Sequence, residues 1–97
     1  MDSIEGTVVN NEAAGRFDLE IEGNRASIYY ERHPDTITFL RTYVHPELSG
    51  QGVGSRMAGA ALDYARAEGL GVVPHCRFVS AYIRRHPEYQ ELVQEEY

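Results

Sequence analysis

The glycine-rich segment Pro46–Arg56 constrains this chain more than any other, because it places glycines at alternate positions directly before the longest helical pattern. Glycine has no Cβ atom, so the backbone N–H groups of Gly50, Gly52 and Gly54 can approach a ligand closely. A helix that begins at such a loop adds unpaired N–H donors and the positive end of its dipole. The segment therefore predicts a site for phosphate or pyrophosphate at the start of a helix.

The chain before this loop has the pattern of antiparallel strands. Phe17–Ile21 alternates apolar and acidic residues, which is typical of a strand with one solvated face. Gly23-Asn24 then predicts a tight hairpin turn into a second strand at Arg25–Glu31. Nearer the amino terminus, the composition predicts a strand at Ile4–Val9 and a turn at Asn10–Gly15.

Thr36–Val44 leads directly to the glycine loop. It is rich in β-branched and aromatic residues at successive positions, which predicts an inner strand covered on both faces. The helix after the loop is expected to end at Glu68, with Gly69 as its left-handed cap. Three- and four-residue spacing predicts its apolar stripe, which consists of Val53, Met57, Ala60, Ala61, Tyr64 and Ala65.

Gly71–Pro74 is too short for a helix and predicts a brief buried strand. A strand, a crossover helix and a second strand in one sheet normally run parallel, so we expect it to pair with Thr36–Val44 in that direction. A second helix is predicted from His75 or Cys76 to Arg85. The apolar residues expected to dock from this helix and from the short amphipathic end, Glu91–Tyr97, are Phe78, Val79, Tyr82, Ile83, Leu92 and Val93.

The composition limits the classes of protein to which this chain can belong. A length of 97 residues suits one domain, 1–97. A net charge of −6 argues against nucleic-acid binding, and 42% hydrophobic residues are ordinary for a soluble globular protein. The acidic start Met1–Glu5 has no apolar run, and the single Cys76 excludes an internal disulfide, so a cytoplasmic protein without a membrane segment is expected.

These elements, in this order, resemble the core of the GNAT superfamily of acyl-CoA-dependent N-acetyltransferases. Gly50–Gly54 resembles the superfamily's pyrophosphate motif, Q/R-x-x-G-x-G/A: Gly52 and Gly54 match its last two fixed positions, and Ser49 stands where Gln or Arg is usual. From Phe17 to Val93, the chain is also similar to a group of small single-domain GNAT-like proteins. The residues that carry this second resemblance are Ala60-Ala61-Leu62-Asp63-Tyr64-Ala65-Arg66, Pro74, Cys76, Phe78-Val79, Tyr82-Ile83 and His86-Pro87-Glu88-Tyr89.

The resemblance implies a minimal GNAT-like α+β fold: an antiparallel meander, the glycine loop, a helix, a short parallel strand and a C-terminal helix. It also implies acetyl-CoA as co-substrate, with the pantetheine arm lying between two splayed strands and pairing with the first at Tyr43, Val44 and His45. His75 stands where many members carry Asn, so a contact with CoA or the substrate is expected there. The residues expected at the pyrophosphate are Gly50, Gln51, Gly52, Val53, Gly54, Ser55 and Arg56.

Cys76 and Tyr82 are the candidate catalytic residues. Cys76 is expected at a helix N-terminus, which favours a thiolate, and it could form an acetyl-cysteine intermediate, line the pocket or be a small buried hydrophobe. Tyr82 matches a tyrosine that protonates the departing CoA thiolate in many GNAT enzymes, although an aromatic residue on an apolar helix face also fits a core. His45 and His75 are candidate general bases, because imidazole titrates near neutral pH.

Three arginines have competing interpretations. Arg56 could reach a phosphate or be solvated, whereas Arg84 and Arg85 suit the negative end of a helix dipole better than the CoA 3′-phosphate. No spacing such as H-E-x-x-H is present, so no metal is predicted.

The sequence therefore predicts an acetyl-CoA-dependent N-acetyltransferase that moves an acetyl group to an amine, directly or through Cys76. The alternatives are a CoA-binding or protein-interaction module without turnover and a small nucleotide-phosphate binder. The early helices and terminal strand pair that commonly build the acceptor pocket in full-length GNAT proteins have no counterpart here. The acceptor stays open between a small molecule, a polyamine and a protein amine, and a homodimer could complete the pocket.

Overall fold

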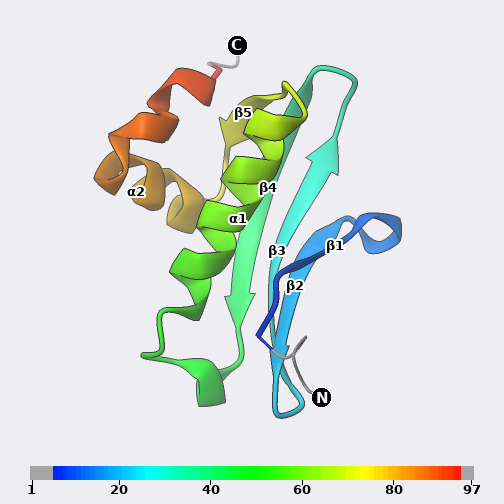
Figure 1. Ribbon diagram of the computed structural model, residues 1–97, viewed down its shortest axis with the longest axis vertical. Helices are drawn as coiled ribbons and strands as arrows, with labels where there is room; N and C mark the ends of the chain where they lie inside the picture. Colours follow the sequence, from blue (N-terminus) through cyan, green and yellow to red (C-terminus); the bar gives the residue numbers. More distant parts are fainter. Residues whose placement is uncertain (1–5, 95–97) are drawn as a thin grey trace.

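A mixed sheet organises the molecule (Figure 1), and the computed structural model describes residues 6–94. The five strands of this range lie side by side in sequence order. Strands β1 to β4 pair antiparallel, and β4 pairs with β5 in parallel, which confirms the predicted α+β fold class. The elements are β1 Val9–Asn11, β2 Arg16–Ile21, β3 Asn24–Arg32, β4 Thr36–Val44, α1 Val53–Ala67, β5 Gly71–Pro74 and α2 Arg77–Arg85, with 3₁₀ turns at Glu12–Ala14, Pro46–Leu48 and Pro87–Leu92.

The first strand lies later in the chain than predicted. Residues 4 and 5 of the expected strand lie outside the described range, and β1 includes Asn10 and Asn11, which we expected in a turn. Both side chains bond to sheet neighbours: the Asn10 Oδ1 accepts a hydrogen bond of 2.6 Å from the Tyr30 hydroxyl, and the Asn11 amide donates to Asp18. These bonds offset the low strand propensity of asparagine.

The hairpin between β2 and β3 is confirmed, but its turn is shifted by one residue. Ile21 pairs with Asn24, so the turn consists of Glu22 and Gly23 rather than Gly23 and Asn24. Their φ angles are 52° and 81°, as a type I′ turn requires at both central positions. Within residues 6–94, Glu22 is the only residue other than glycine with a positive φ.

Helix α1 covers one face of the sheet and contacts β2 to β5 (Figure 1). Its apolar stripe is rotated relative to the prediction, because the Tyr64 ring packs at the margin of the core against Phe17 and its hydroxyl accepts a hydrogen bond from Arg32. Neither α1 nor any other helix in residues 6–94 is long and apolar enough to cross a membrane. The prediction is confirmed at Val53, Met57, Ala61 and Ala65, whereas Ala60 and Tyr64 are half-buried and Ala58 and Leu62 are fully buried instead.

Strand β4 is an inner strand only over its first half. Its pairing with β5 ends where Phe39 meets Pro74, and β4 continues to Val44 with β3 as its partner. The prediction of cover on both faces is correct for Ile37–Phe39, which are buried. It is wrong for the second half, where Leu40, Arg41 and Tyr43 are exposed.

The end of the described chain runs back along β5. Val93 forms a parallel bridge with Val72, and the Gln94 N–H donates to the carbonyl of Val72 at 2.8 Å. Leu92 and Val93 pack against the core, as predicted. Of the amphipathic end Glu91–Tyr97, the last three residues lie outside the described range. The segment covers part of the β5 edge, which would otherwise present unpaired backbone groups.

Candidate functional site

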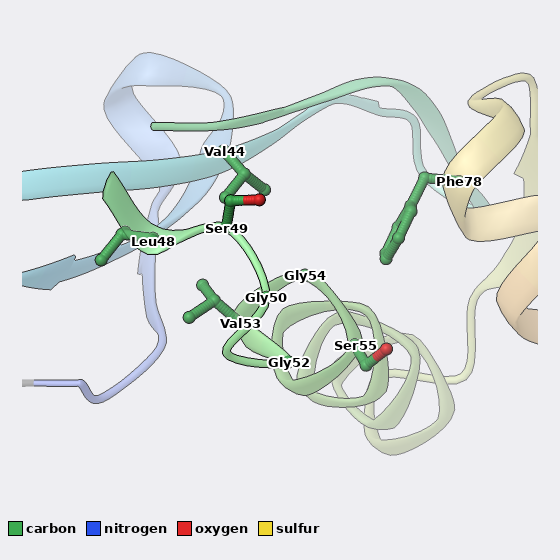
Figure 2. Close-up of a pocket in the computed structure, with 9 residues that line it drawn as sticks. All are labelled: Val44, Leu48, Ser49, Gly50, Gly52, Val53, Gly54, Ser55 and Phe78. Carbon is green, nitrogen blue, oxygen red and sulfur yellow. The ribbon is translucent and has the colours of Figure 1, made fainter. Parts of the chain in front are cut away.

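A cavity of about 270 Å³ opens where the glycine loop meets the end of β4 and the start of α2 (Figure 2). Val44 borders it from β4, and the Phe78 ring points toward it from α2. Sequence analysis predicted Val44 and Gly50–Ser55 as ligand contacts. It gave Leu48 and Ser49 only as part of the glycine-rich segment and Phe78 only as an apolar residue of the second helix. The lining residues are Val44, Leu48, Ser49, Gly50, Gly52, Val53, Gly54, Ser55 and Phe78.

The N-terminus of α1 faces this cavity. The first intrahelical hydrogen bond joins the Arg56 N–H to the carbonyl of Gly52 at 3.1 Å, so the N–H groups of Val53–Ser55 have no helical acceptor. Gly52 is the N-cap and supplies no capping side chain, and the first turn contains no acidic residue. The positive end of the helix dipole is therefore not neutralised locally, which suits an anion.

The three glycines of the motif have different structural roles. Gly50 and Gly52 have φ angles of 80° and 73°, and a Cβ atom at either position would meet only open space. Gly54 lies within the helix, and a Cβ atom there would come within 2.8 Å of the Phe78 ring. Gly50 and Gly52 shape an open backbone turn beside the cavity, whereas Gly54 makes room for a side chain that borders it.

A β-bulge in β4 changes which residues direct their backbone N–H and C=O groups to β3 and which direct them to the opposite edge. Arg41 pairs with Tyr29 and Phe39 pairs with Tyr30, so Leu40 is an extra residue in β4. Before the bulge, odd-numbered residues face β5, as the bond from the Cys76 N–H to the Phe39 carbonyl shows. A bulge residue shifts this alternation by one.

After the bulge, odd-numbered residues face β3: the His45 N–H donates to the carbonyl of Arg25 at 3.2 Å. The backbone groups of Thr42 and Val44 are therefore directed to the side that β5 has left. This edge begins beside the cavity, because Val44 also lines it. It offers unpaired donors and acceptors to an extended ligand that enters from the glycine loop.

Cys76 lies at the point where β4 and β5 diverge. It is the N-cap of α2, its side chain is 3% exposed, and its Sγ lies 3.1 Å from the hydroxyl oxygen of Thr42. Thr42 belongs to the open half of β4 and is 34 residues away in sequence, so no local pattern could reveal this contact. The thiol thus has a polar partner at the inner end of the open edge.

Tyr82 lies on α2 and faces α1. Its ring stacks on His86 with centroids 4.0 Å apart, and its hydroxyl oxygen lies near the position a Cβ atom would take on Gly59. Burial raises the pKa of Tyr82, and the carboxylates of Asp63 and Glu88 raise it further. The hydroxyl is therefore held protonated, and it lies against Gly59 of α1.

The histidines predicted near the cofactor have different environments. The His45 Nδ1 accepts a hydrogen bond of 3.0 Å from the Glu47 N–H, so this side chain caps the 3₁₀ turn before the glycine loop. His75 is exposed between β5 and α2, next to Cys76. Tyr43, the third predicted pantetheine contact besides Val44 and His45, is 45% exposed on β4.

The polar residues flanking the α1 terminus bond within the protein. The exposed Arg56 donates from its guanidinium to the Gly6 carbonyl, which ties the start of α1 to the amino-terminal segment. Gln51 donates from its Nε2 to the Glu47 carbonyl at 3.1 Å. Both are absent from the cavity lining, and so are Tyr43, His45 and His75. Within residues 6–94, no group of three His, Cys, Asp or Glu side chains is placed to hold a metal ion.

Comparison with known proteins agrees with the observed fold. Residues 16–92 match the model of a family described as GCN5-related N-acetyl-transferase, and the chain belongs to this family. It is also similar to the NMR solution structure of a GCN5-like candidate N-acetyltransferase from Staphylococcus aureus. The two chains share 27% identity with a TM-score of 0.69, over 100% of this chain and 94% of the other.

Proposed function

We propose that this protein binds acetyl-CoA and transfers its acetyl group to an amine. Membership of the GCN5-related N-acetyltransferase family supports this reaction class. The observation that carries the proposal is a shared strand: Val44 of the open β4 edge lines the cavity at the α1 terminus, and Thr42 of the same edge contacts the buried Cys76 thiol. A long ligand with a phosphate at one end and a thioester at the other fits this arrangement.

The glycine loop holds the pyrophosphate in this proposal. The free N–H groups of Val53–Ser55 and the turn at Gly50 and Gly52 donate to its oxygens. The pantetheine arm follows the open edge and pairs with the backbone of Thr42 and Val44. Thr42 replaces two of the predicted Tyr43–His45 contacts in this proposal, since Tyr43 pairs with β3, and the His45 N–H and carbonyl bond to Arg25 and Leu48.

The acetyl group then lies where β4 and β5 diverge, beside Cys76. The Cys76 sulfur attacks the thioester carbonyl carbon, CoA leaves as a thiolate and takes up the proton that the Cys76 thiol gave up, and an acetyl-cysteine forms. The incoming amine attacks this acetyl-cysteine, forms an amide, loses a proton and restores the thiol. Thr42 is a positioning residue, because its hydroxyl holds the sulfur at 3.1 Å.

Of the two routes considered for the transfer, the position of Cys76 favours the covalent one. Tyr82 is stacked on His86 and packed toward Gly59, so direct transfer with Tyr82 as general acid would need the thioester to lie between the helices. The Tyr82→Phe variant is therefore expected to retain most of the activity. The matched control is the Cys76→Ala variant, which is expected to lose the activity.

The covalent route is tested by mixing the protein with acetyl-CoA alone and measuring the intact mass. We expect one added acetyl group on Cys76, its absence in Cys76→Ala, and slower formation in Thr42→Val, which keeps the side-chain shape but removes the hydroxyl. Acetyl-CoA binding without an adduct, together with an active Cys76→Ala variant, would eliminate this route. Binding without any CoA release across a broad panel of amines would instead indicate a non-catalytic CoA-binding module.

A further inference from the structure

Near the Cys76 thiol, one face of β4 is buried and the other is exposed. Thr42 is paired with Ile28, a fully buried core residue, so it faces the side of the sheet covered by α1. Adjacent strand residues face opposite sides, which places Arg41 and Tyr43 on the other face. Both are exposed there. In the proposed function CoA occupies the edge beside Val44, which leaves this other face for a second substrate.

Arg41 has a fixed position on that face. Its guanidinium carbon lies 4.1 Å from the centroid of the Tyr29 ring, directly across the strand pair. This cation–π contact orients the planar group while leaving its N–H donors at the rim. The ion pairs within residues 6–94 do not include Arg41, so no carboxylate of the described chain neutralises it.

Two arginines of the described chain are held by carboxylates of the protein itself. Arg16 pairs with Asp18 at 2.8 Å, and Arg66 pairs with Glu91 at 3.2 Å. Arg41 differs because an aromatic ring, and not an acceptor, holds it. A guanidinium in this setting retains its capacity for a bidentate bond to a carboxylate.

We infer that Arg41 recognises a carboxylate on the amine acceptor, which makes the acceptor an amino acid or a related amino-carboxylate. The inference rests on the proposed function. Because Arg41 and Cys76 lie on opposite sides of β4, several bonds must separate the amine from the carboxylate, as in a long ω-amino acid.

The test uses product analogues, so it does not depend on turnover. The protein is first titrated with CoA by calorimetry and then, saturated with CoA, with 6-acetamidohexanoate or with its methyl ester. We expect the carboxylate to bind roughly tenfold to a hundredfold more tightly than the ester, as for a hydrogen bond to a charged group. N-acetylglycine, in which the groups are close together, should bind no better than the ester.

Variants separate Arg41 from the overall charge. Arg41→Ala should abolish the preference for the carboxylate, and Arg25→Ala, which removes the same charge from an exposed position on β3, should retain it. Tyr29→Leu should weaken the preference, because the guanidinium loses its aromatic support. Equal affinity for acid and ester, or a preference that survives in Arg41→Ala, would overturn this inference and leave the proposed function standing. Failure to bind CoA would overturn the proposed function, and this inference with it.

Discussion

The two halves of β4 belong to one strand but differ in the pairing of their edges. Residues 37–39 pair with β3 on one side and β5 on the other, and Phe39 is fully buried. Residues 41–44 pair with β3 alone and leave the other edge open. One extra residue, Leu40, separates them. The comparison shows that a single bulge can divide a strand into a structural half and a half suited to binding.

The largest expected effect is on stability and distinguishes the halves directly. Phe39→Ala should cost about 3–5 kcal/mol, because it removes a fully buried ring and leaves a cavity. Leu40→Ala, one residue further, should change stability by no more than about 0.5 kcal/mol, because Leu40 is 37% exposed. Urea denaturation measures both. Similar losses for the two variants would contradict the division of the strand.

A pair of proline variants tests the reversed alternation. Tyr43→Pro removes an N–H that faces β3, and Val44→Pro removes one that faces the open edge. Tyr43→Pro is therefore expected to cost about 1–3 kcal/mol more than Val44→Pro, because it leaves a β3 carbonyl without its donor. Thermal unfolding gives the difference. If Val44→Pro were the more damaging variant, the assignment of the open edge would be wrong.

The glycine motif allows a finer test of the same contrast between structure and binding. Gly54→Ala should destabilise the protein by about 1–2 kcal/mol and weaken CoA binding, because the new methyl group displaces the Phe78 ring. The double variant Gly54→Ala with Phe78→Leu should recover both. Gly52→Ala should show no such rescue, because its penalty lies in the backbone conformation, where φ is 73°. Calorimetric titration with CoA and thermal unfolding are the measurements.

The smallest expected effect lies away from β4, where Tyr89 donates a hydrogen bond of 2.7 Å to Asp63. This bond raises the pKa of Tyr89 to about 12. The protonated hydroxyl is thus favoured by folding, so its stabilisation is complete below about pH 10 and is lost as the pH rises toward 12. Tyr89→Phe should cost about 1 kcal/mol at neutral pH, abolish this alkaline loss and leave CoA binding unchanged. A change in CoA affinity would connect this cluster to the site.

The arrangement of strands and helices could be predicted because each element has a local signal. The alternation in Phe17–Ile21, the spacing in α1 and the glycine at position 69 all act within a few residues, and the structure confirms them. The hairpin turn was predicted one residue late. Both Glu22-Gly23 and Gly23-Asn24 contain a glycine that suits a tight turn, and only the pairing of β2 with β3 decides between them.

The candidate site could be predicted only where it depends on residues that are close together in the sequence. The glycine loop and Cys76 carry local signals, whereas the Thr42 contact joins residues far apart in sequence. The bulge at Leu40 has no glycine or proline to mark it, so the reversal of the β4 edge could not be foreseen. Arg41 was not identified for the same reason: its role depends on Tyr29 across the strand pair.

The most direct test of the account is a crystal structure with acetyl-CoA bound to the Cys76→Ser variant. We expect the pyrophosphate at the N-terminus of α1, the pantetheine paired with Thr42 or Val44, and the thioester carbon within about 3.5 Å of the residue 76 side-chain oxygen. A thioester placed beside the Tyr82 hydroxyl, with the open edge of β4 unoccupied, would contradict the claim that this half of β4 is built for binding.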